Sequence, residues 1–187
     1  MMFDKHERGS SIHANDRAIG ATHAMVTLLE YIDFECPDSA VAAQLLEGLV
    51  ADQRDRLRLI FRHFPRESVH PGALTVAEAA EAAAAQGHFW AMHDRLLTHQ
   101  RELREDNLRT HAEAVGLDLQ RFEDELSRHA HAAKVRRDMR QGIQDGVSAT
   151  PALFINDWRY EGPLDRSSLL EAIAARVNGA YAESPSP

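Results

Sequence analysis

The chain has 187 residues, of which 44% are hydrophobic and 27% are charged, and its formal net charge is -8. These values are typical of one globular domain, or of one domain that carries an insertion. The negative charge argues against a general binder of nucleic acid or of an anionic membrane surface. No apolar run approaches the roughly 20 residues that span a bilayer, so no membrane partner is expected either.

Cys36 is the only cysteine, so the chain cannot form an internal disulfide. The N-terminal residues are polar and lack the apolar core of a secretory signal. Both observations favour a cytoplasmic protein, because thiols stay reduced in the cytoplasm. Residues 1–16 have no periodicity and are expected to form a disordered arm. Residues 182–187, rich in serine and proline, are expected to form a disordered tail.

The most informative stretch of the sequence surrounds this cysteine. Residues 25–32 are apolar and β-branched, which predicts a buried strand. Cys36 and Pro37 then open a helix whose apolar residues recur at helical spacing up to Val50. Unpaired amides at a helix N-terminus favour a thiolate. A lone cysteine is often an inert buried side chain, but its place at the start of a helix favours a reactive, partly exposed thiol.

The remaining pattern predicts a helical block between two α/β segments. Residues 57–64 form a second strand that Pro65 ends, and the helix between the two strands implies that they are parallel. The pattern is helical from residue 70 to residue 144. Helices are expected at 70–86, at 88–100, from a cap at Asp106 to Gly116, from a cap at Asp118, and at 130–144.

The last part of the chain predicts a hairpin followed by a helix. Residues 151–155 and 158–160 form its strands, with Asn156 and Asp157 in the turn. Asp165 caps the final helix. The domain organisation is therefore an α/β half at residues 17–65, a helical insertion at 66–145 and a second half at 146–181.

These motifs resemble the DsbA-like oxidoreductases of the thioredoxin fold, in particular the cytoplasmic members. The matching segments are Val26-Thr27-Leu28-Leu29-Glu30-Tyr31-Ile32-Asp33-Phe34-Glu35-Cys36-Pro37, Phe61-Arg62-His63-Phe64-Pro65, His70-Pro71, Gln86-Gly87-His88-Phe89-Trp90-Ala91-Met92-His93-Asp94 and Gly146-Val147-Ser148-Ala149-Thr150-Pro151-Ala152-Leu153-Phe154-Ile155-Asn156. The resemblance covers residues 16 to 180. It implies an α/β thioredoxin fold, β-α-β … β-β-α, with an all-helical insertion between its two halves.

The resemblance also implies roles for individual residues. Cys36 corresponds to the attacking thiol of the family's Cys-x-x-Cys motif. Thr150 and Pro151 correspond to its cis-proline loop, whose backbone binds a substrate chain as an added strand; an ordinary trans turn is the alternative. Glu30 corresponds to the buried acid of the fold, unless it is a strand-end carboxylate in water. Arg58 or Arg62 on the neighbouring strand could neutralise it.

Ser39 stands where the family has its second cysteine. Without that cysteine the protein cannot store two oxidising equivalents internally, although the Ser39 hydroxyl could hydrogen-bond the Cys36 thiolate. Pro37 and Asp38, between these two positions, are expected to contact the substrate. The helix N-terminus stabilises the Cys36 thiolate, and the carboxylates of Glu35 and Asp38 act against this effect, because nearby negative charge disfavours a thiolate.

Three functions fit these residues. The first is a monothiol thiol-disulfide oxidoreductase, in which Cys36 forms a mixed disulfide with a protein or a small thiol and an external thiol such as glutathione resolves it. The second is a glutathione-binding protein similar to the kappa-class transferases and the chromene-carboxylate isomerases, which carry a serine near this site. The third is a peptide-binding module that has lost catalysis. No cofactor is expected, apart from glutathione as a candidate co-substrate.

The chain has eleven histidines, which raises the question of a metal site. His88 and His93 are five residues apart, which is not the i, i+4 spacing of a helical metal pair. His129 and His131 lie close enough for chelation, but no cysteine or carboxylate at ligand spacing completes the set. Solvated or hydrogen-bonded histidines are the better interpretation, so no metal is predicted. Phe89 and Trp90 indicate core or lid packing.

Overall fold

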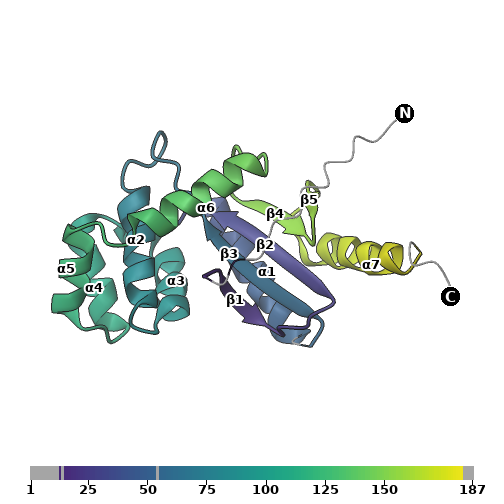
Figure 1. Ribbon diagram of the computed structural model, residues 1–187, viewed down its shortest axis with the longest axis horizontal. Coiled ribbons are helices and arrows are strands. Elements are labelled where there is room, and N and C mark those ends of the chain that lie inside the picture. The colour runs from purple at the N-terminus through teal and green to yellow at the C-terminus, as the bar shows by residue number, and fades with distance from the viewer. Residues whose placement is uncertain (1–12, 14, 54, 183–187) are drawn as a thin grey trace. The chain divides into compact units, whose positions relative to one another are not determined.

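The computed structural model describes residues 13, 15–53 and 55–182 (Figure 1). The arm predicted for residues 1–16 and the tail predicted for residues 182–187 lie almost entirely outside these residues. The chain forms two compact units. Of the described residues, one unit takes those up to Glu30, those of Ala42–Phe61 and those from Ala152; the other takes Tyr31–Val41 and Arg62–Pro151. Each unit combines separate stretches of the chain, whereas the predicted domains were continuous ranges. The predicted boundaries after residues 65 and 145 therefore stay a prediction.

The first unit is built on a mixed five-stranded sheet with the strand order β1-β3-β2-β4-β5. The strands are β1 (Arg17–Gly20), β2 (Val26–Ile32), β3 (Leu57–His63), β4 (Ala152–Ile155) and β5 (Trp158–Tyr160). β1 runs antiparallel to β3, and β4 runs antiparallel to β5. The four predicted strands are confirmed. β1 was not expected, because its four residues contain a single large apolar side chain.

Helices α1 (Pro37–Asp52) and α7 (Arg166–Ala182) share the core of the first unit with the sheet. The core consists of completely or nearly completely buried side chains: Val26, Leu28, Leu46, Leu49, Val50, Leu57, Leu59, Leu153, Ile155, Tyr160, Leu169 and Ile173. Burying one such aliphatic side chain contributes about 1.5–3 kcal/mol. This packing fixes β2 and α1, the two elements between which Cys36 lies in the sequence.

The second unit contains the helical block. Its helices are α2 (Ala73–Ala84), α3 (Phe89–Thr98), the short 3-10 helix η1 (Gln100–Glu102), α4 (Glu105–Ala114), α5 (Leu119–Ser127) and α6 (Ala132–Gln144). Helix α2 contacts each of α3, α4, α5 and α6. Its sequence is rich in alanine, which is both a strong helix former and small enough for close helix contact. The predicted all-helical insertion is confirmed, with shorter helices than expected.

Two of the three predicted helix caps are present. The Asp118 side chain accepts the Arg121 N–H at 3.0 Å, and Asp165 accepts the Ser168 N–H at 3.0 Å. The expectation for Asp106 is wrong, because α4 begins one residue earlier and Asp106 lies in its first turn. There its carboxylate still complements the helix dipole.

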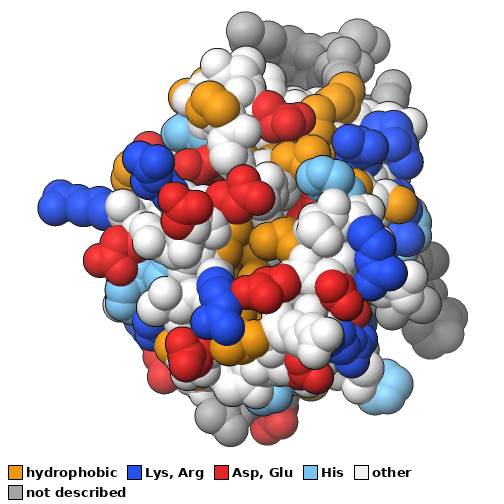
Figure 2. All heavy atoms as spheres, turned by 90° about the vertical axis from the view of Figure 1, so that its left-hand side faces the viewer, with side chains coloured by type: hydrophobic (Ala, Val, Ile, Leu, Met, Phe, Trp, Pro, Cys, Tyr) orange, Lys and Arg blue, Asp and Glu red, His pale blue; other side chains and the backbone are white. Residues whose placement is uncertain are grey.

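Helices α4 and α5 present a polar surface. Figure 2 shows acidic and basic side chains interspersed over this face, and the ion pairs of Arg109 with Glu123 and of Arg121 with Glu125 belong to it. Exposed pairs of this kind contribute about 0–1 kcal/mol each.

Within residues 13, 15–53 and 55–182, no helix combines the length and the apolar character that crossing a membrane requires.

Candidate active site

Asp33 organises the turn that leads from β2 to Cys36. Its buried carboxylate accepts the backbone N–H of Glu35 and that of Arg66, each at 2.9 Å. It also lies 2.9 Å from Nδ1 of His70, which must be the donor because an ionised carboxylate only accepts. The carbonyl oxygen of Asp33 accepts the Cys36 N–H at 3.0 Å. Asp33 thus holds the turn through its side chain and through its backbone carbonyl.

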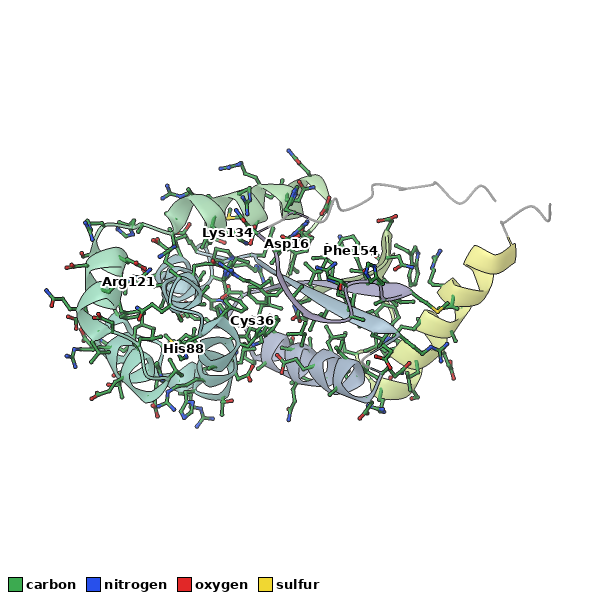
Figure 3. All side chains as sticks on the ribbon, turned by 60° about the horizontal axis from the view of Figure 1, so that its bottom comes forward. Asp16, Cys36, His88, Arg121, Lys134 and Phe154 are labelled. Atoms are coloured by element: carbon green, nitrogen blue, oxygen red, sulfur yellow. The ribbon has the colours of Figure 1, made fainter. Side chains whose placement is uncertain are left out.

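Cys36 directly precedes α1, which begins at Pro37 (Figure 3). Its sulfur donates a hydrogen bond to the carbonyl oxygen of Thr150 at 3.3 Å. Its own carbonyl accepts the Ser39 N–H at 3.1 Å. The residue is only 8% exposed, so the expectation of a partly exposed thiol is wrong. The reason is that the Thr150 loop, more than a hundred residues away in the sequence, lies against the sulfur.

The loop against Cys36 contains Thr150 and Pro151. The peptide bond between them is cis, as the resemblance implied. Pro151 is half-buried, whereas Thr150 is 7% exposed. The Thr150 hydroxyl oxygen is buried and has no hydrogen-bond partner among the residues that the structure describes. The structure therefore brings together Cys36 and the proline loop.

Ser39 lies one helical turn after Cys36 and is completely buried. Its hydroxyl oxygen accepts the Asp33 N–H at 3.4 Å. The hydrogen bond that this hydroxyl could have formed with Cys36 is not present: the hydroxyl contacts the backbone of the turn, and the sulfur contacts Thr150. Pro37 and Asp38, between these two residues, are exposed to solvent, where a substrate could reach them.

Gln100 is a functional candidate that sequence reasoning missed. The side-chain amide of this η1 residue donates to the carbonyl oxygens of Phe34 and Cys36, each at 2.8 Å. It therefore ties the helical block to the carbonyl groups of Phe34 and Cys36, the two residues on either side of Glu35. A glutamine at the end of a helix gives no signal of such a contact in the sequence.

Two carboxylates lie beside Cys36. Glu35 is half-buried, and its Oε2 atom is enclosed and has no hydrogen-bond partner among the described residues. A Cβ on Gly72 would lie 3.5 Å from this oxygen, so the carboxylate packs on the backbone of that turn. Desolvation and the charge of Asp33 raise the pKa of Glu35, while His70 opposes the shift. Asp38 is exposed.

Glu30, the predicted buried acid of β2, is 1% exposed. Neither of its carboxylate oxygens has a hydrogen-bond partner among the described residues. Burial, and to a lesser degree the charge of Glu47, raise the pKa of Glu30 to about 8. Neither Arg58 nor Arg62 hydrogen-bonds the Glu30 carboxylate, so the suggestion that one of them neutralises it is wrong. Arg62 instead donates to the Tyr31 hydroxyl at 3.1 Å.

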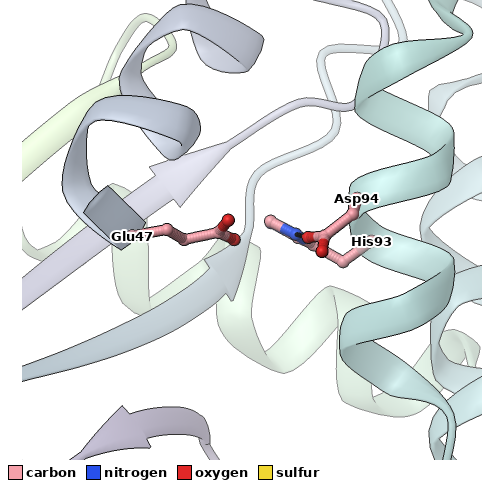
Figure 4. Close-up of side chains that lie close together, drawn as sticks. All are labelled: Glu47, His93 and Asp94. Atoms are coloured by element: carbon pink, nitrogen blue, oxygen red, sulfur yellow. Dashed lines mark hydrogen bonds and ion pairs between the residues drawn. The ribbon is translucent and has the colours of Figure 1, made fainter. Parts of the chain in front are cut away.

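Three histidines of the helical block are hydrogen-bonded to carboxylates: His93, His129 and His131. His93, completely buried, has its Nδ1 atom 2.9 Å from Asp94 (Figure 4). Burial lowers the pKa of His93, although Asp94 opposes the shift. The ring of His93 contacts the rings of Phe34, Phe89 and Trp90. This cluster confirms a packing role for the two aromatic residues of α3.

The other pair of histidines considered for a metal is also engaged. Nδ1 of His129 lies 3.1 Å from Glu78, and Nε2 of His131 lies 2.8 Å from Glu125. Each ring faces a different carboxylate, so hydrogen bonding accounts for both positions. His88 is exposed.

Comparison with known proteins places this site in a family. The sequence pattern of the thioredoxin family matches residues 13–175. The chain belongs to the thioredoxin family. Its fold also matches solved DsbA-like structures. A thioredoxin-like oxidoreductase from Silicibacter pomeroyi DSS-3 is 26% identical, with a TM-score of 0.79 over 89% of this chain and 94% of that one. BdbD from Bacillus subtilis is 20% identical, with a TM-score of 0.76 over 87% and 93%.

The curated relatives of this thioredoxin-family protein are much longer than the chain itself. The Na(+)/H(+) antiporter NhaA 3 of Salinispora tropica is 42% identical over 167 residues, which are 89% of this chain and 25% of the antiporter. NhaA of Herminiimonas arsenicoxydans is 36% identical over 164 residues. The chain therefore spans about a quarter of the length of the curated relatives that it matches.

Proposed function

We propose that this protein is a monothiol thiol-disulfide oxidoreductase. The supporting observation is the contact between the Cys36 sulfur and the carbonyl oxygen of Thr150 next to the cis bond. A substrate chain that pairs with the backbone of this loop would bring its own sulfur to Cys36. Ser39 provides no second sulfur, so each cycle needs a thiol from outside the chain.

The reaction has two exchange steps. The Cys36 thiolate attacks one sulfur of a disulfide; a Cys36–S bond forms, the substrate S–S bond breaks, and the second half leaves as a thiolate. An external thiolate then attacks the mixed disulfide, forms a new disulfide with the bound half and regenerates the Cys36 thiolate. Glutathione and a cytoplasmic location belong to this proposal, because a reducing compartment supplies the external thiol that such a site needs.

The roles of the surrounding residues follow from their contacts. Asp33 and Gln100 hold the chain before Cys36 in place. The Asp33 carboxylate accepts backbone N–H groups, and the Gln100 amide donates to backbone carbonyl groups. Pro37 and Asp38, both exposed, would contact the substrate. Glu30 would serve as a buried proton donor, since its pKa of about 8 means that it still holds a proton at neutral pH.

A turnover assay tests this function. Hydroxyethyl disulfide and glutathione are supplied, and oxidised glutathione is followed by the consumption of NADPH by glutathione reductase. We expect catalysis by the wild type and none by Cys36→Ser. Equal rates for the two proteins would contradict the proposal.

A non-catalytic binding module is the second candidate. It is favoured by the match to a quarter of a Na(+)/H(+) antiporter, in which a thioredoxin-like segment would serve as an appended module. Such a module would bind a protein partner at the Thr150 loop equally well before and after Cys36→Ser. A third outcome, glutathione binding without turnover by Cys36→Ser, would support the transferase-like alternative.

A further inference from the structure

Two carboxylates without an ion-pair partner among the described residues flank Cys36, and the only positive influence on Glu35 comes from His70, which is itself bound to Asp33. Glu35 precedes the cysteine and Asp38 follows it by two residues. Within the part of the chain that the structure describes, neither carboxylate forms an ion pair or accepts a side-chain hydrogen bond. Asp33, the third acid of this turn, differs from both because it is paired with His70.

The positions of Glu35 and Asp38 in the chain limit how far each carboxylate can lie from the sulfur. Consecutive Cα atoms are about 3.8 Å apart, so with fully extended side chains each carboxylate is within roughly 12 Å of the sulfur. The Glu35 carboxylate is also held in place, because it packs on the backbone of Gly72 with one enclosed oxygen. Charges at this range are only partly screened at low ionic strength, where the Debye length exceeds about 10 Å.

We propose that Glu35 and Asp38 select the reaction partner of Cys36 by charge, favouring disulfides and thiols with a cationic group near sulfur over anionic ones. This inference rests on the proposed function, because it concerns the partner in the same exchange reaction. A partner with a positive group near sulfur is attracted as it approaches the Cys36 thiolate, whereas a carboxylate in that position is repelled. Glutathione, which carries a net negative charge, then still resolves the adduct but does so more slowly than an aminothiol. A basic peptide segment or an aminothiol is a fast partner.

Three disulfides of nearly equal size test the proposal. Cystamine, hydroxyethyl disulfide and 3,3'-dithiodipropionate carry an ammonium, a hydroxyl and a carboxylate two carbons from sulfur. Mixed-disulfide formation at Cys36 is timed by intact-mass spectrometry at low ionic strength and pH 8. Each rate is divided by the rate of the same disulfide with a neutral reference thiol, N-acetylcysteine amide, which removes differences in leaving-group chemistry.

The expected order is cystamine first and dithiodipropionate last, with a ratio of about fivefold, as Coulomb energies at this distance in water predict. The ratio should fall toward one in Glu35→Gln/Asp38→Asn and at high salt. The control Glu113→Gln removes an exposed acid of α4 and should leave the ratio unchanged. Arg66→Gln, which removes a cation from the turn that contacts Asp33, should not lower it.

The outcomes separate the two proposals. Adducts that form at equal normalised rates, or a preference that survives in the double variant, overturn selection by charge and leave the oxidoreductase function intact. The absence of an adduct with all three disulfides, while the protein is folded, overturns both.

Discussion

Nδ1 of His70 donates a hydrogen bond to the Asp33 carboxylate at 2.9 Å, and this contact joins the turn after β3 to the turn before Cys36. The same carboxylate accepts two backbone N–H groups, one from each turn. An ionised acceptor forms stronger hydrogen bonds than a neutral one. Asp33 is therefore the residue that sets the geometry of the chain around the thiol.

Replacing Asp33 by asparagine should destabilise the fold by about 2–3 kcal/mol, because an amide group cannot accept at both oxygen positions. Urea unfolding measures the change. The matched control is Asp38→Asn, which alters an exposed carboxylate and should change the free energy of unfolding by less than about 0.5 kcal/mol. Equal effects of the two substitutions would show that the Asp33 contacts contribute little.

Glu30 should make stability fall as pH rises. Its pKa is about 8 in the folded state and near 4.5 when unfolded. Between these values the folded protein holds a proton that the unfolded chain has lost, so deprotonation favours unfolding. The loss begins above pH 4.5, levels off above pH 8 and is at most on the order of a few kcal/mol. In Glu30→Gln this slope should be absent; an unchanged slope would contradict the assignment.

Gly142 and Gly48 should respond to alanine in opposite ways. Both lie in helices, where alanine is favoured over glycine by about 0.5–1 kcal/mol. A Cβ at Gly48 meets nothing within 4 Å, so Gly48→Ala should stabilise the protein. A Cβ at Gly142 would lie 2.7 Å from the Phe64 ring, so Gly142→Ala should destabilise it. Thermal unfolding of both variants decides; stabilisation by both would mean that the Phe64 ring moves aside at little cost.

Gln100→Glu should expose the thiol. The new carboxylate has nearly the same shape but cannot donate to the carbonyls of Phe34 and Cys36, so the turn loosens. Alkylation of Cys36 by iodoacetamide should then accelerate severalfold when it is measured at a pH at which the thiol is fully ionised, so that the new negative charge does not change the thiolate fraction. Gln86→Glu is the matched control, since Gln86 likewise bridges backbone groups, those of Asp118. It should cost stability without changing the alkylation rate. Unchanged alkylation in Gln100→Glu would remove Gln100 from the site.

The parts of the fold that sequence could predict depend on local patterns. The strand before Cys36 is a continuous apolar run, and the helices of the insertion repeat every three to four residues, so their positions agree with the structure within a few residues. β1 escaped prediction because it is held by pairing with β3 rather than by its own composition. The cap at Asp118 was predictable, since its acceptor serves an N–H three residues away.

The parts of the site that sequence could not predict depend on contacts between distant segments. The burial of Cys36 results from Thr150, which is 114 residues away. Gln100, 64 residues from Cys36, bonds only to backbone, which any sequence provides. The partner of Ser39 depends on which way its hydroxyl points within one turn. The pairing of Cys36 with the proline loop was available only through the resemblance to DsbA-like proteins.

The central claim is that Cys36 forms a mixed disulfide that nothing within the chain resolves. Intact-mass spectrometry after exposure to the neutral hydroxyethyl disulfide tests it most directly. The wild type should carry one adduct that persists until an external thiol is added, and Cys36→Ser should carry none. In Ser39→Cys the new thiol should expel the adduct and leave an internal disulfide. A folded wild type that forms no adduct would contradict the account.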